Sequence, residues 1–257
     1  MLPFFQDVIA PMLAAFEPAS IVEIGSEHGK VTRKLCDLAG GWSGTVHAID
    51  PAPLFDVGVW TKDLSPTLVV HEAKSLDALG AIDRMDAVLI DGDHNWFTVI
   101  EELRMVERLA KERGHAHPFV LLHDVAWPYG RRDLYYDPGS IPAEHRQPHA
   151  QRGISPTASA LCERGGMNAH LFNADHEGGP RNGVLTAVED YLRESDQPMT
   201  FATIPAAFGL AILLPRPLAE RVPALDALVA PWLAPAVHAF IDRLETARIA
   251  MLTQTRA

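Results

Sequence analysis

Short apolar runs alternate with helical patterns along most of this chain, and this alternation limits the possible fold more than any other sequence feature. Each run is apolar throughout, as expected for strands of a mostly parallel sheet that helices cover on both faces. The predicted strands are Ser20–Gly25, Thr45–Asp50, Thr67–Glu72, Ala87–Asp91, Phe119–His123, Thr200–Ile204 and Leu210–Pro215. We therefore predict an α/β fold with a Rossmann-like, doubly wound sheet of seven strands. The sheet is mostly parallel, with an antiparallel strand at its C-terminal edge.

Helices are predicted where apolar residues recur every three to four positions, at Lys30–Leu38, Trp96–Ala110 and Val184–Leu192. Pro11 predicts a kinked or split helix over Phe4–Phe16, because proline lacks an amide proton.

Two segments do not follow the alternation. Residues 125–182 form an insertion far longer than a usual connection, and loops of this size are often lids over a binding site. After Pro235, apolar residues form a stripe on one helical face, at Val237, Phe240, Ile241, Leu244, Ala247 and Met251. This stripe predicts a C-terminal helix that packs on its own domain, with a homodimer contact as the alternative.

The segment Ile21–Gly29 joins a strand to a helix through two glycines four residues apart. Gly25 permits a sharp turn after the strand, and Gly29 permits a ligand to approach the backbone. Glu23 would repel a phosphate but can accept hydrogen bonds from an ammonium group, and the G-x-G-x-x-G phosphate motif is absent from the sequence. Asp50, at the tip of the second strand, can accept hydrogen bonds from both ribose hydroxyls. The pattern predicts a nucleoside ligand with an amino-acid-like tail.

Carboxylates and imidazoles follow the fourth and fifth predicted strands. Asp91, Asp93 and His94 come after the fourth strand, and His123 and Asp124 after the fifth. Because parallel strands end at the same edge of a sheet, we expect these side chains to converge. Like charges so close together need a counter-ion or raised pKa values, so the cluster predicts a metal site or a site of proton transfer.

Together these features resemble class I S-adenosylmethionine-dependent methyltransferases. The resemblance implies that S-adenosylmethionine is the cofactor, that Asp50 binds its ribose and that Ser75 lies near its adenine. The implied cofactor-binding residues are Glu23, Gly25, Ser26, Gly29, Asp50, Ser75 and Asp91. It also implies one domain over residues 1–257, with a cofactor-binding half (17–124), the insertion (125–182), a segment that completes the core (183–215) and a helical extension (225–253).

The D-G-D-H and H-D motifs resemble those of a broad family that includes metal-dependent sugar and small-molecule O-methyltransferases. This resemblance implies that Asp91, His123 and Asp124 hold a divalent metal, Mn²⁺ or Mg²⁺, and that Asp93 is the base. The relatives usually carry Asp-Asp or Asp-Asn after the fifth strand, and a histidine there shifts the preference from Mg²⁺ towards Mn²⁺ or iron. The alternative is a metal-free site in which His94 or His123 removes the acceptor proton. The predicted catalytic residues are Asp93 and His94.

Aromatic and arginine side chains begin the insertion directly after Asp124. They suit stacking on sugars or rings and binding of carboxylate or phosphate groups. We predict a lid over the substrate, and a structural flap or a dimerisation arm is the alternative. The candidate substrate-binding residues are Trp127, Tyr129, Arg131, Arg132, Tyr135 and Tyr136.

The formal net charge of −11 argues against a nucleic-acid partner, which would need a basic face. The longest apolar stretches, 204–215 and 227–241, are too short or too interrupted to span a membrane. Two cysteines and the lack of a basic-then-apolar leader predict a soluble cytoplasmic protein. We expect an O-methyltransferase for a hydroxyl of a sugar-containing or small natural-product acceptor. The alternatives are a metal-independent N- or O-methyltransferase with a His/Asp base, and a non-catalytic nucleoside-binding protein.

Overall fold

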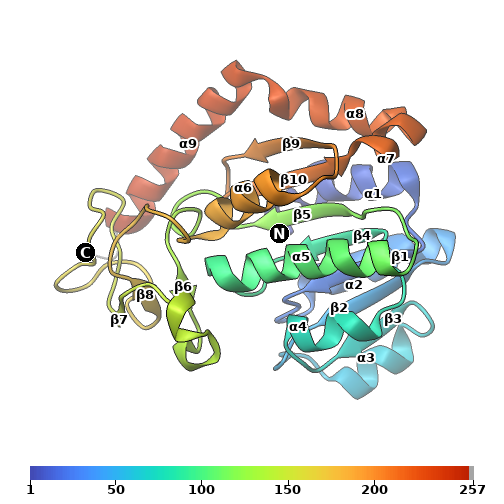
Figure 1. Cartoon of the computed structure of the whole chain (residues 1–257), viewed down its shortest axis with the longest axis horizontal. Helices are drawn as coiled ribbons and strands as arrows, with labels where there is room; N and C mark the ends of the chain where they lie inside the picture. The colour runs from blue at the N-terminus through green and yellow to red at the C-terminus, as the bar shows by residue number, and fades with distance from the viewer. Residues whose placement is uncertain (255–257) are drawn as a thin grey trace.

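A seven-stranded sheet forms the centre of the computed structural model, which describes residues 1–254 (Figure 1). In spatial order its strands are β3 (Leu68–His71), β2 (Thr45–Ile49), β1 (Ser20–Ile24), β4 (Ala87–Ile90), β5 (Phe119–His123), β10 (Leu210–Pro215) and β9 (Met199–Ile204). The strands β1 to β5 are parallel, and β10 lies antiparallel between β5 and β9. The predicted doubly wound fold with its C-terminal hairpin is confirmed. Strand order reverses between β1 and β4, and α/β sheets bind ligands in the crevice at such a reversal.

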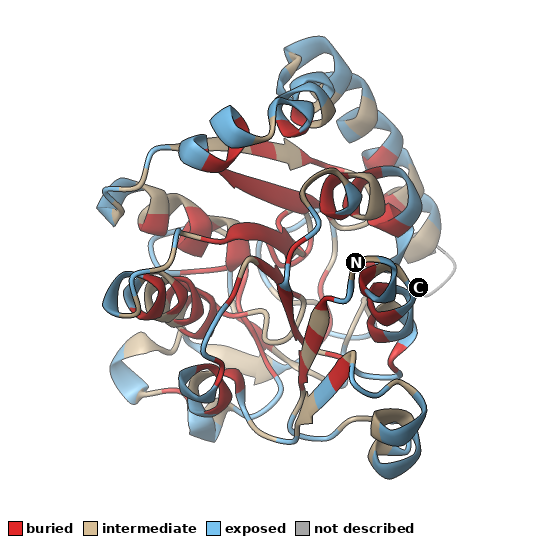
Figure 2. Ribbon diagram, turned by 90° about the vertical axis from the view of Figure 1, so that its right-hand side faces the viewer, coloured by how far each residue is buried: buried red, intermediate tan, exposed pale blue. Residues whose placement is uncertain are grey.

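Helices cover both faces of the sheet, and its central strands, β1, β4, β5 and β10, are almost completely buried (Figure 2). One face carries α4 (Ser75–Ala78), α5 (Trp96–Glu112) and α6 (Val184–Glu194), and the other α1 (Ala10–Phe16), α2 (Lys30–Ala39), α3 (Val57–Asp63), α7 (Arg216–Arg221) and α8 (Pro223–Val229). The helix α5 begins where the Asn95 side chain accepts the Thr98 amide at 2.8 Å. Short 3₁₀ turns occur at Leu2–Phe4, Gly40–Trp42, Leu79–Ala81, Pro138–Ser140, Ala143–His145 and Ala230–Leu233.

The N-terminal helix changes type before Pro11 without a break, because Ile9 and Ala10 at the junction both have helical φ and ψ. A 3₁₀ turn and a π-helical segment, Phe5–Ile9, precede α1. Met1, Phe4 and Phe5 are buried. Met1 contacts Asp91 after β4, and Phe4 contacts His123 at the end of β5. No local pattern predicts that this segment lies beside the ends of β4 and β5.

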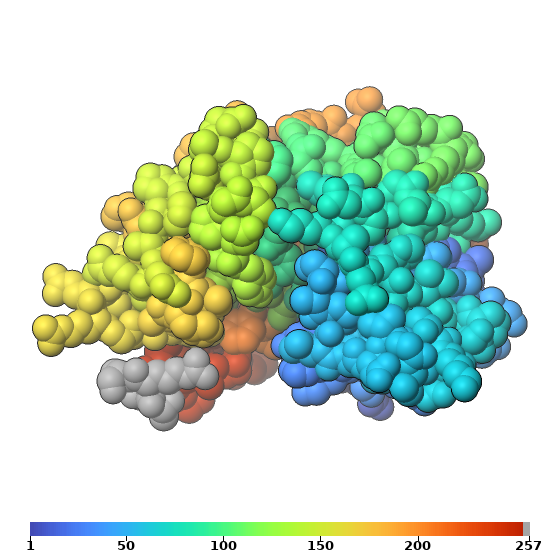
Figure 3. Space-filling view, turned by 90° about the horizontal axis from the view of Figure 1, so that it is seen from below, coloured from blue at the N-terminus to red at the C-terminus, as the bar shows by residue number. Residues whose placement is uncertain are grey.

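The insertion contains three short strands that sequence analysis did not predict, β6 (Leu134–Tyr135), β7 (His149–Gln151) and β8 (Phe172–Ala174), with β8 between the other two. Buried Asp133 anchors it: its Oδ1 accepts the amides of Trp96 at 2.7 Å and Gly183 at 2.6 Å. Both ends of the insertion are therefore tied to the start of α5. Seen from below, a groove separates the insertion (yellow-green) from the half that contains β1 to β3 (blue to cyan; Figure 3).

The C-terminal helix α9 (Pro235–Gln254) crosses the end of the β9–β10 hairpin (Figure 1). Glu245 and Ile249 face the protein and are buried, whereas Val237, Phe240 and Leu244 are exposed. Within residues 1–254, no single helix has the length and apolar composition needed to cross a membrane. Only the pair Pro223–Leu233 and Pro235–Thr253 reaches these criteria in combination, and it is bent by 60°.

Candidate active site

Asp91, His123 and Asp124 meet where β4 and β5 end, as the sequence predicts. One potential ligand atom from each lies within 4.8 Å of the others. The His123 Nδ1 atom is 3.1 Å from Asp91 Oδ1 and 2.9 Å from Asp124 Oδ2. Asp124 has a φ of 60°, a left-handed conformation that costs a non-glycine residue on the order of 1–3 kcal/mol and that often occurs at functional sites.

The orientation of the His123 ring is fixed by the Ala207 carbonyl oxygen, 3.0 Å from Nε2. A carbonyl only accepts, so Nε2 carries a proton and Nδ1 faces the two carboxylates. Burial lowers the pKa of His123, but Asp124 and Asp91 outweigh burial and raise this pKa to about 9. A divalent metal would take the place of the proton on Nδ1, and the carbonyl contact is the outer support common for histidine ligands. The three side chains therefore fit a divalent metal.

A second imidazole, His94, uses the same carboxylate. Its Nε2 is 2.7 Å from Asp124 Oδ2, and its Nδ1 is 3.5 Å from the Tyr136 hydroxyl. Burial lowers the pKa of His94, but the attraction of Asp124 is stronger and the pKa lies above its ordinary value. Because Asp124 can only accept, Nε2 donates to it, and neutral His94 keeps its lone pair on Nδ1.

Asp93 points to a different neighbour. Its Oδ2 accepts the Thr98 hydroxyl at 3.3 Å, in the first turn of α5, and burial raises its pKa. This hydrogen bond ties Asp93 to the start of α5 and not to His94 or Asp124. Its predicted role as the base stays a prediction.

The N-terminal segment closes one side of the cluster. The Met1 amino group lies 2.8 Å from Asp91 Oδ2, and the Phe4 ring meets the His123 ring edge-on at 5.9 Å between centroids. Sequence analysis assigned neither residue to the site, since nothing in the local pattern places the first residues beside strands that end at positions 90 and 123.

The two glycines after β1 are required by packing. A Cβ atom on Gly25 would lie 2.2 Å from the Asp91 carbonyl oxygen, and one on Gly29 would lie 2.7 Å from the Trp60 ring. Both have positive φ, 89° and 70°. Between them, Ser26 is 5% exposed, and its hydroxyl has no hydrogen-bond partner among residues 1–254. Burying a hydroxyl without a hydrogen-bond partner costs free energy and is rare in proteins. The Ser26 hydroxyl therefore supports a ligand in this crevice that would be its partner.

Two predicted cofactor contacts are engaged within the protein. Glu23 accepts the Thr32 hydroxyl, and burial raises its pKa to about 8, so its carboxyl is neutral at pH 7. Asp50 accepts the amides of Glu27 at 2.7 Å and Ala52 at 2.8 Å, which joins the loops after β1 and β2. Each Asp50 oxygen keeps a second lone pair for a ligand.

Another predicted cofactor contact, Ser75, is also engaged within the protein: its hydroxyl donates to Glu102 on α5. Glu102 is 0% exposed, its Oε2 has no partner in the described residues, and burial raises its pKa to about 8. Sequence analysis missed this carboxyl, which sits at a core position of an otherwise amphipathic helix.

Glu102→Gln is expected to stabilise the protein at pH 8.5 by on the order of 3 kcal/mol and to have little effect at pH 4.5. The folded pKa is raised above the unfolded value near 4.5, so the fold holds a proton that the unfolded chain releases. Wild-type stability therefore falls as pH rises from about 4.5 to 8, and glutamine removes this loss. Urea unfolding at both pH values checks it, with half-exposed Glu101→Gln as the control. An equal gain at both pH values would contradict it.

Four of the six predicted substrate residues are engaged in contacts within the protein, three of them inside the insertion. Arg132 is 1% exposed and donates to the carbonyls of Ala174 and Ser159. Arg131 pairs with Glu189 at 2.7 Å. Buried Tyr129 and Tyr135 bond within the insertion, to Asn173 at 3.2 Å and Asp133 at 2.7 Å. Trp127 is partly exposed, and Tyr136, 57% exposed, lies at His94.

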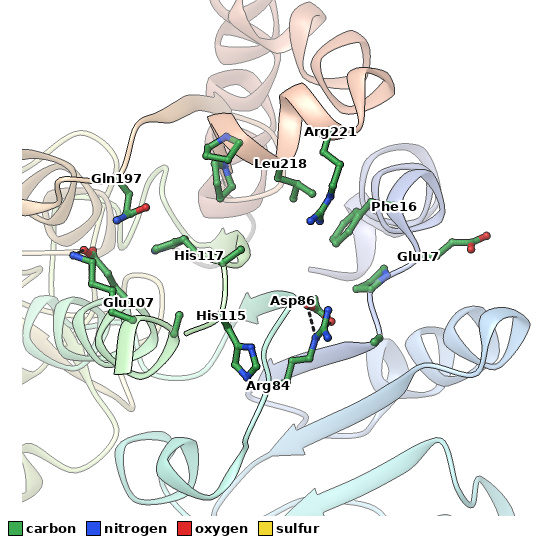
Figure 4. Close-up of a pocket in the computed structure, with 17 residues that line it drawn as sticks. Phe16, Glu17, Arg84, Asp86, Glu107, His115, His117, Gln197, Leu218 and Arg221 are labelled. Atoms are coloured by element: carbon green, nitrogen blue, oxygen red, sulfur yellow. Dashed lines mark hydrogen bonds and ion pairs between the residues drawn. The ribbon is translucent and has the colours of Figure 1, made fainter. Parts of the chain in front are cut away.

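A cavity of about 290 Å³ lies at the opposite edge of the sheet (Figure 4). Asp86 and His117 line it just before β4 and β5 begin, and Phe16, Leu218 and Arg221 line it from α1 and α7. None of the predicted site residues lines this cavity.

A family model described as a methyltransferase domain matches residues 22–125. No curated protein matches the chain. The matched segment runs from β1 to just beyond Asp124, so it contains both the crevice after β1 and the acid–histidine cluster.

Solved structures with a similar fold include three methyltransferase or cofactor complexes. PaMTH1 of Podospora anserina, bound to S-adenosylhomocysteine, shares 11% identity over 81% of this chain and 76% of its own, with a TM-score of 0.47. Cofactor-bound Rv0187 from MTB shares 17% identity over 82% of this chain and 80% of its own, with a TM-score of 0.48. The 1,6-didemethyltoxoflavin-N1-methyltransferase of Burkholderia thailandensis, with 1,6-didemethyltoxoflavin and S-adenosylhomocysteine, shares 13% over 81% and 78%, with a TM-score of 0.45.

Proposed function

We propose that this chain, whose residues 22–125 match a methyltransferase domain, is a class I S-adenosylmethionine-dependent methyltransferase, and we propose its substrate class and site. The reaction is methyl transfer to a hydroxyl of a sugar-containing or small natural-product acceptor, supported by a divalent metal. The observation that carries the proposal is the convergence of Asp91, His123 and Asp124 within 4.8 Å, with His94 on the same carboxylate.

The cofactor is S-adenosylmethionine, which supplies the methyl group. We assign it to the crevice between β1 and β4, where the orphan Ser26 hydroxyl and the free lone pairs of Asp50 offer polar contacts. The acidic surroundings of Asp91 suit the positive charge of the methionine ammonium and the sulfonium. The proposed cofactor residues are Glu23, Gly25, Ser26, Gly29, Asp50, Ser75 and Asp91.

The proposed metal ligands are Asp91, His123 and Asp124. Two carboxylates and one imidazole suit Mn²⁺ better than Mg²⁺, which prefers oxygen ligands. A metal at this position would lower the pKa of an acceptor hydroxyl and hold its oxygen in place.

His94 is the proposed general base. Asp124 fixes its Nε2 as a donor and leaves Nδ1 as the proton acceptor, the arrangement by which an Asp–His pair activates a hydroxyl. Tyr136, next to Nδ1, is the proposed contact for the acceptor, and the groove between the insertion and the β1–β3 half admits it. Asp93, oriented by Thr98, is the second candidate base. In-line placement of the acceptor oxygen supplies the remaining rate enhancement.

A metal-free O- or N-methyltransferase is the second candidate. It is favoured by the direct contact of 2.9 Å between His123 and Asp124, which balances the charge of the cluster without an ion. Calorimetric titration decides between the two candidates. S-adenosylmethionine and S-adenosylhomocysteine are titrated into protein treated with EDTA, and Mn²⁺ and Mg²⁺ follow. Micromolar cofactor binding with a separate Mn²⁺ isotherm supports the metal-dependent enzyme, and cofactor binding alone supports the second candidate. No cofactor binding would refute both.

Asp50→Ala is expected to weaken S-adenosylmethionine binding about 10- to 100-fold, because hydrogen bonds to a charged acceptor contribute roughly 1.5–3 kcal/mol. The same titration measures it, and Asp63→Ala, at the end of α3, serves as the control. Equal affinities for the two variants would place the ribose elsewhere.

The proposed partner is a small hydroxylated molecule. The net charge of −11 disfavours nucleic acid, and both cysteines, Cys36 and Cys162, are free thiols, which fits the cytoplasm.

We also propose a homodimer through α9, whose exposed side chains Val237, Phe240 and Leu244 lie on one face. The helix carries two acidic and two arginine residues, so two copies are not repelled there despite the net charge of the chain. Leu244→Glu is expected to halve the mass measured by light scattering, with exposed Thr246→Glu as the control. A monomeric wild type would contradict the proposal.

A further inference from the structure

The turn between β9 and β10 has an unusual backbone. Three consecutive residues, Ala207, Phe208 and Gly209, have positive φ values of 46°, 72° and 93°. Only glycine adopts this region without cost, so the conformation of the first two must be imposed by their surroundings. At the third position a Cβ atom would lie 2.5 Å from the Ala126 amide nitrogen, which requires glycine.

Contacts from two sides hold this turn. The Ala126 amide donates to the Phe208 carbonyl at 2.8 Å, and the Phe208 amide donates to Glu245 Oε1 on α9 at 2.9 Å. Glu245 is buried and forms an ion pair of 2.6 Å with Arg248. The Arg248 guanidinium also lies over the Phe208 ring, 4.6 Å from its centroid. One turn of α9 therefore fixes both the backbone and the side chain of Phe208.

The turn acts directly on the acid–histidine cluster. The carbonyl of Ala207, one residue before Phe208, is the group that accepts His123 Nε2–H at 3.0 Å. That hydrogen bond decides which ring nitrogen faces Asp91 and Asp124. A continuous series of contacts thus joins Glu245, outside the matched segment 22–125, to His123 inside it.

We propose that Glu245 is a positioning residue of the active site: it holds the Phe208 amide, so that the Ala207 carbonyl orients His123. Its relevance to turnover rests on the proposed function, whereas the orientation of His123 can be measured without metal, cofactor or substrate. The C-terminal helix then contributes to the geometry of the site and not only to packing.

The test is the hydrogen-bonded imidazole proton of His123 Nε2, recorded by NMR at one pH and assigned by its loss in His123→Gln. Glu245→Ala removes the acceptor for the Phe208 amide, and we expect the resonance to shift or broaden beyond detection. Glu245→Gln keeps an acceptor oxygen but loses the ion pair with Arg248, and we expect it to restore the signal. Asp242→Ala, exposed on the same helix, is the matched control. Mn²⁺ titration is the second readout, with about 10- to 100-fold weaker binding expected for Glu245→Ala.

An unchanged resonance in Glu245→Ala would overturn the proposal, as would a wild type without this resonance. Equal loss in Glu245→Ala and Glu245→Gln would also overturn it, because the ion pair that docks α9 would then be the cause. If the resonance responds as expected but no S-adenosylmethionine binds, the positioning role stands and the proposed function fails.

Discussion

Replacing His94 by glutamine is expected to slow methyl transfer by about 10²- to 10⁴-fold, the usual contribution of a positioned general base. The glutamine amide can still donate to Asp124, as His94 Nε2 does at 2.7 Å, so the local charge arrangement is kept. The substitution removes Nδ1, the nitrogen that faces Tyr136 and has the free lone pair. Single-turnover methylation with radiolabelled cofactor measures the rate, and calorimetry should give a cofactor affinity close to that of wild type.

Asp93→Asn is the matched comparison, because the resemblance to metal-dependent relatives implies Asp93 as the base. Its contact with Thr98 at 3.3 Å points it to the start of α5. A greater rate loss in Asp93→Asn than in His94→Gln would move the base to Asp93. If either variant lost cofactor binding together with activity, that residue would belong to the cofactor site.

The fold and the cluster could be predicted because their signals are local. Continuous apolar runs predicted all seven strands of the main sheet, and strand order then places residues that follow β4 and β5 at one edge. Asp91, His123 and Asp124 converge for this reason, although 32 or more residues separate the first from the others. The same reasoning placed Gly25 and Gly29 correctly in turns, but the atoms that require them belong to Asp91 and Trp60.

What sequence could not predict depends on tertiary contacts. The strands of the insertion have two or three residues each, too few for a period to be visible. Arg132 looked available for a substrate because arginine is usually exposed, yet it is 1% exposed and bonded to carbonyls of its own insertion. The contributions of Phe4 and Glu245 come from opposite ends of the chain, and no local pattern brings them to His123.

Asp91→Ala is expected to abolish the Mn²⁺ isotherm and to lower turnover at least about 100-fold. Removing a metal ligand should cost more than the roughly 10- to 100-fold loss that follows removal of a group that only supports a ligand. Asp91 lies where the crevice meets the cluster: its backbone packs against Gly25, and its carboxylate lies 3.1 Å from His123 Nδ1. Alanine keeps the backbone contact and removes one of the three ligand groups, so the remaining His123 and Asp124 cannot complete the set. Cofactor affinity should also fall, because a charge facing the crevice is lost.

The matched control is Asp86→Ala, at the other end of the same strand, where the carboxylate accepts the Ser20 amide at 3.0 Å and pairs with Arg84. Both substitutions remove a partly buried carboxylate next to β4, so general destabilisation should affect thermal unfolding of both, but only Asp91→Ala should lose metal binding. A normal Mn²⁺ isotherm in Asp91→Ala would refute the ligand assignment. The wild type could instead bind the cofactor, show no metal isotherm and still depend on His94 for turnover. The Asp124–His94 pair would then be the catalytic unit, and protonated His123, in place of a metal ion, would balance the negative charge of Asp91 and Asp124.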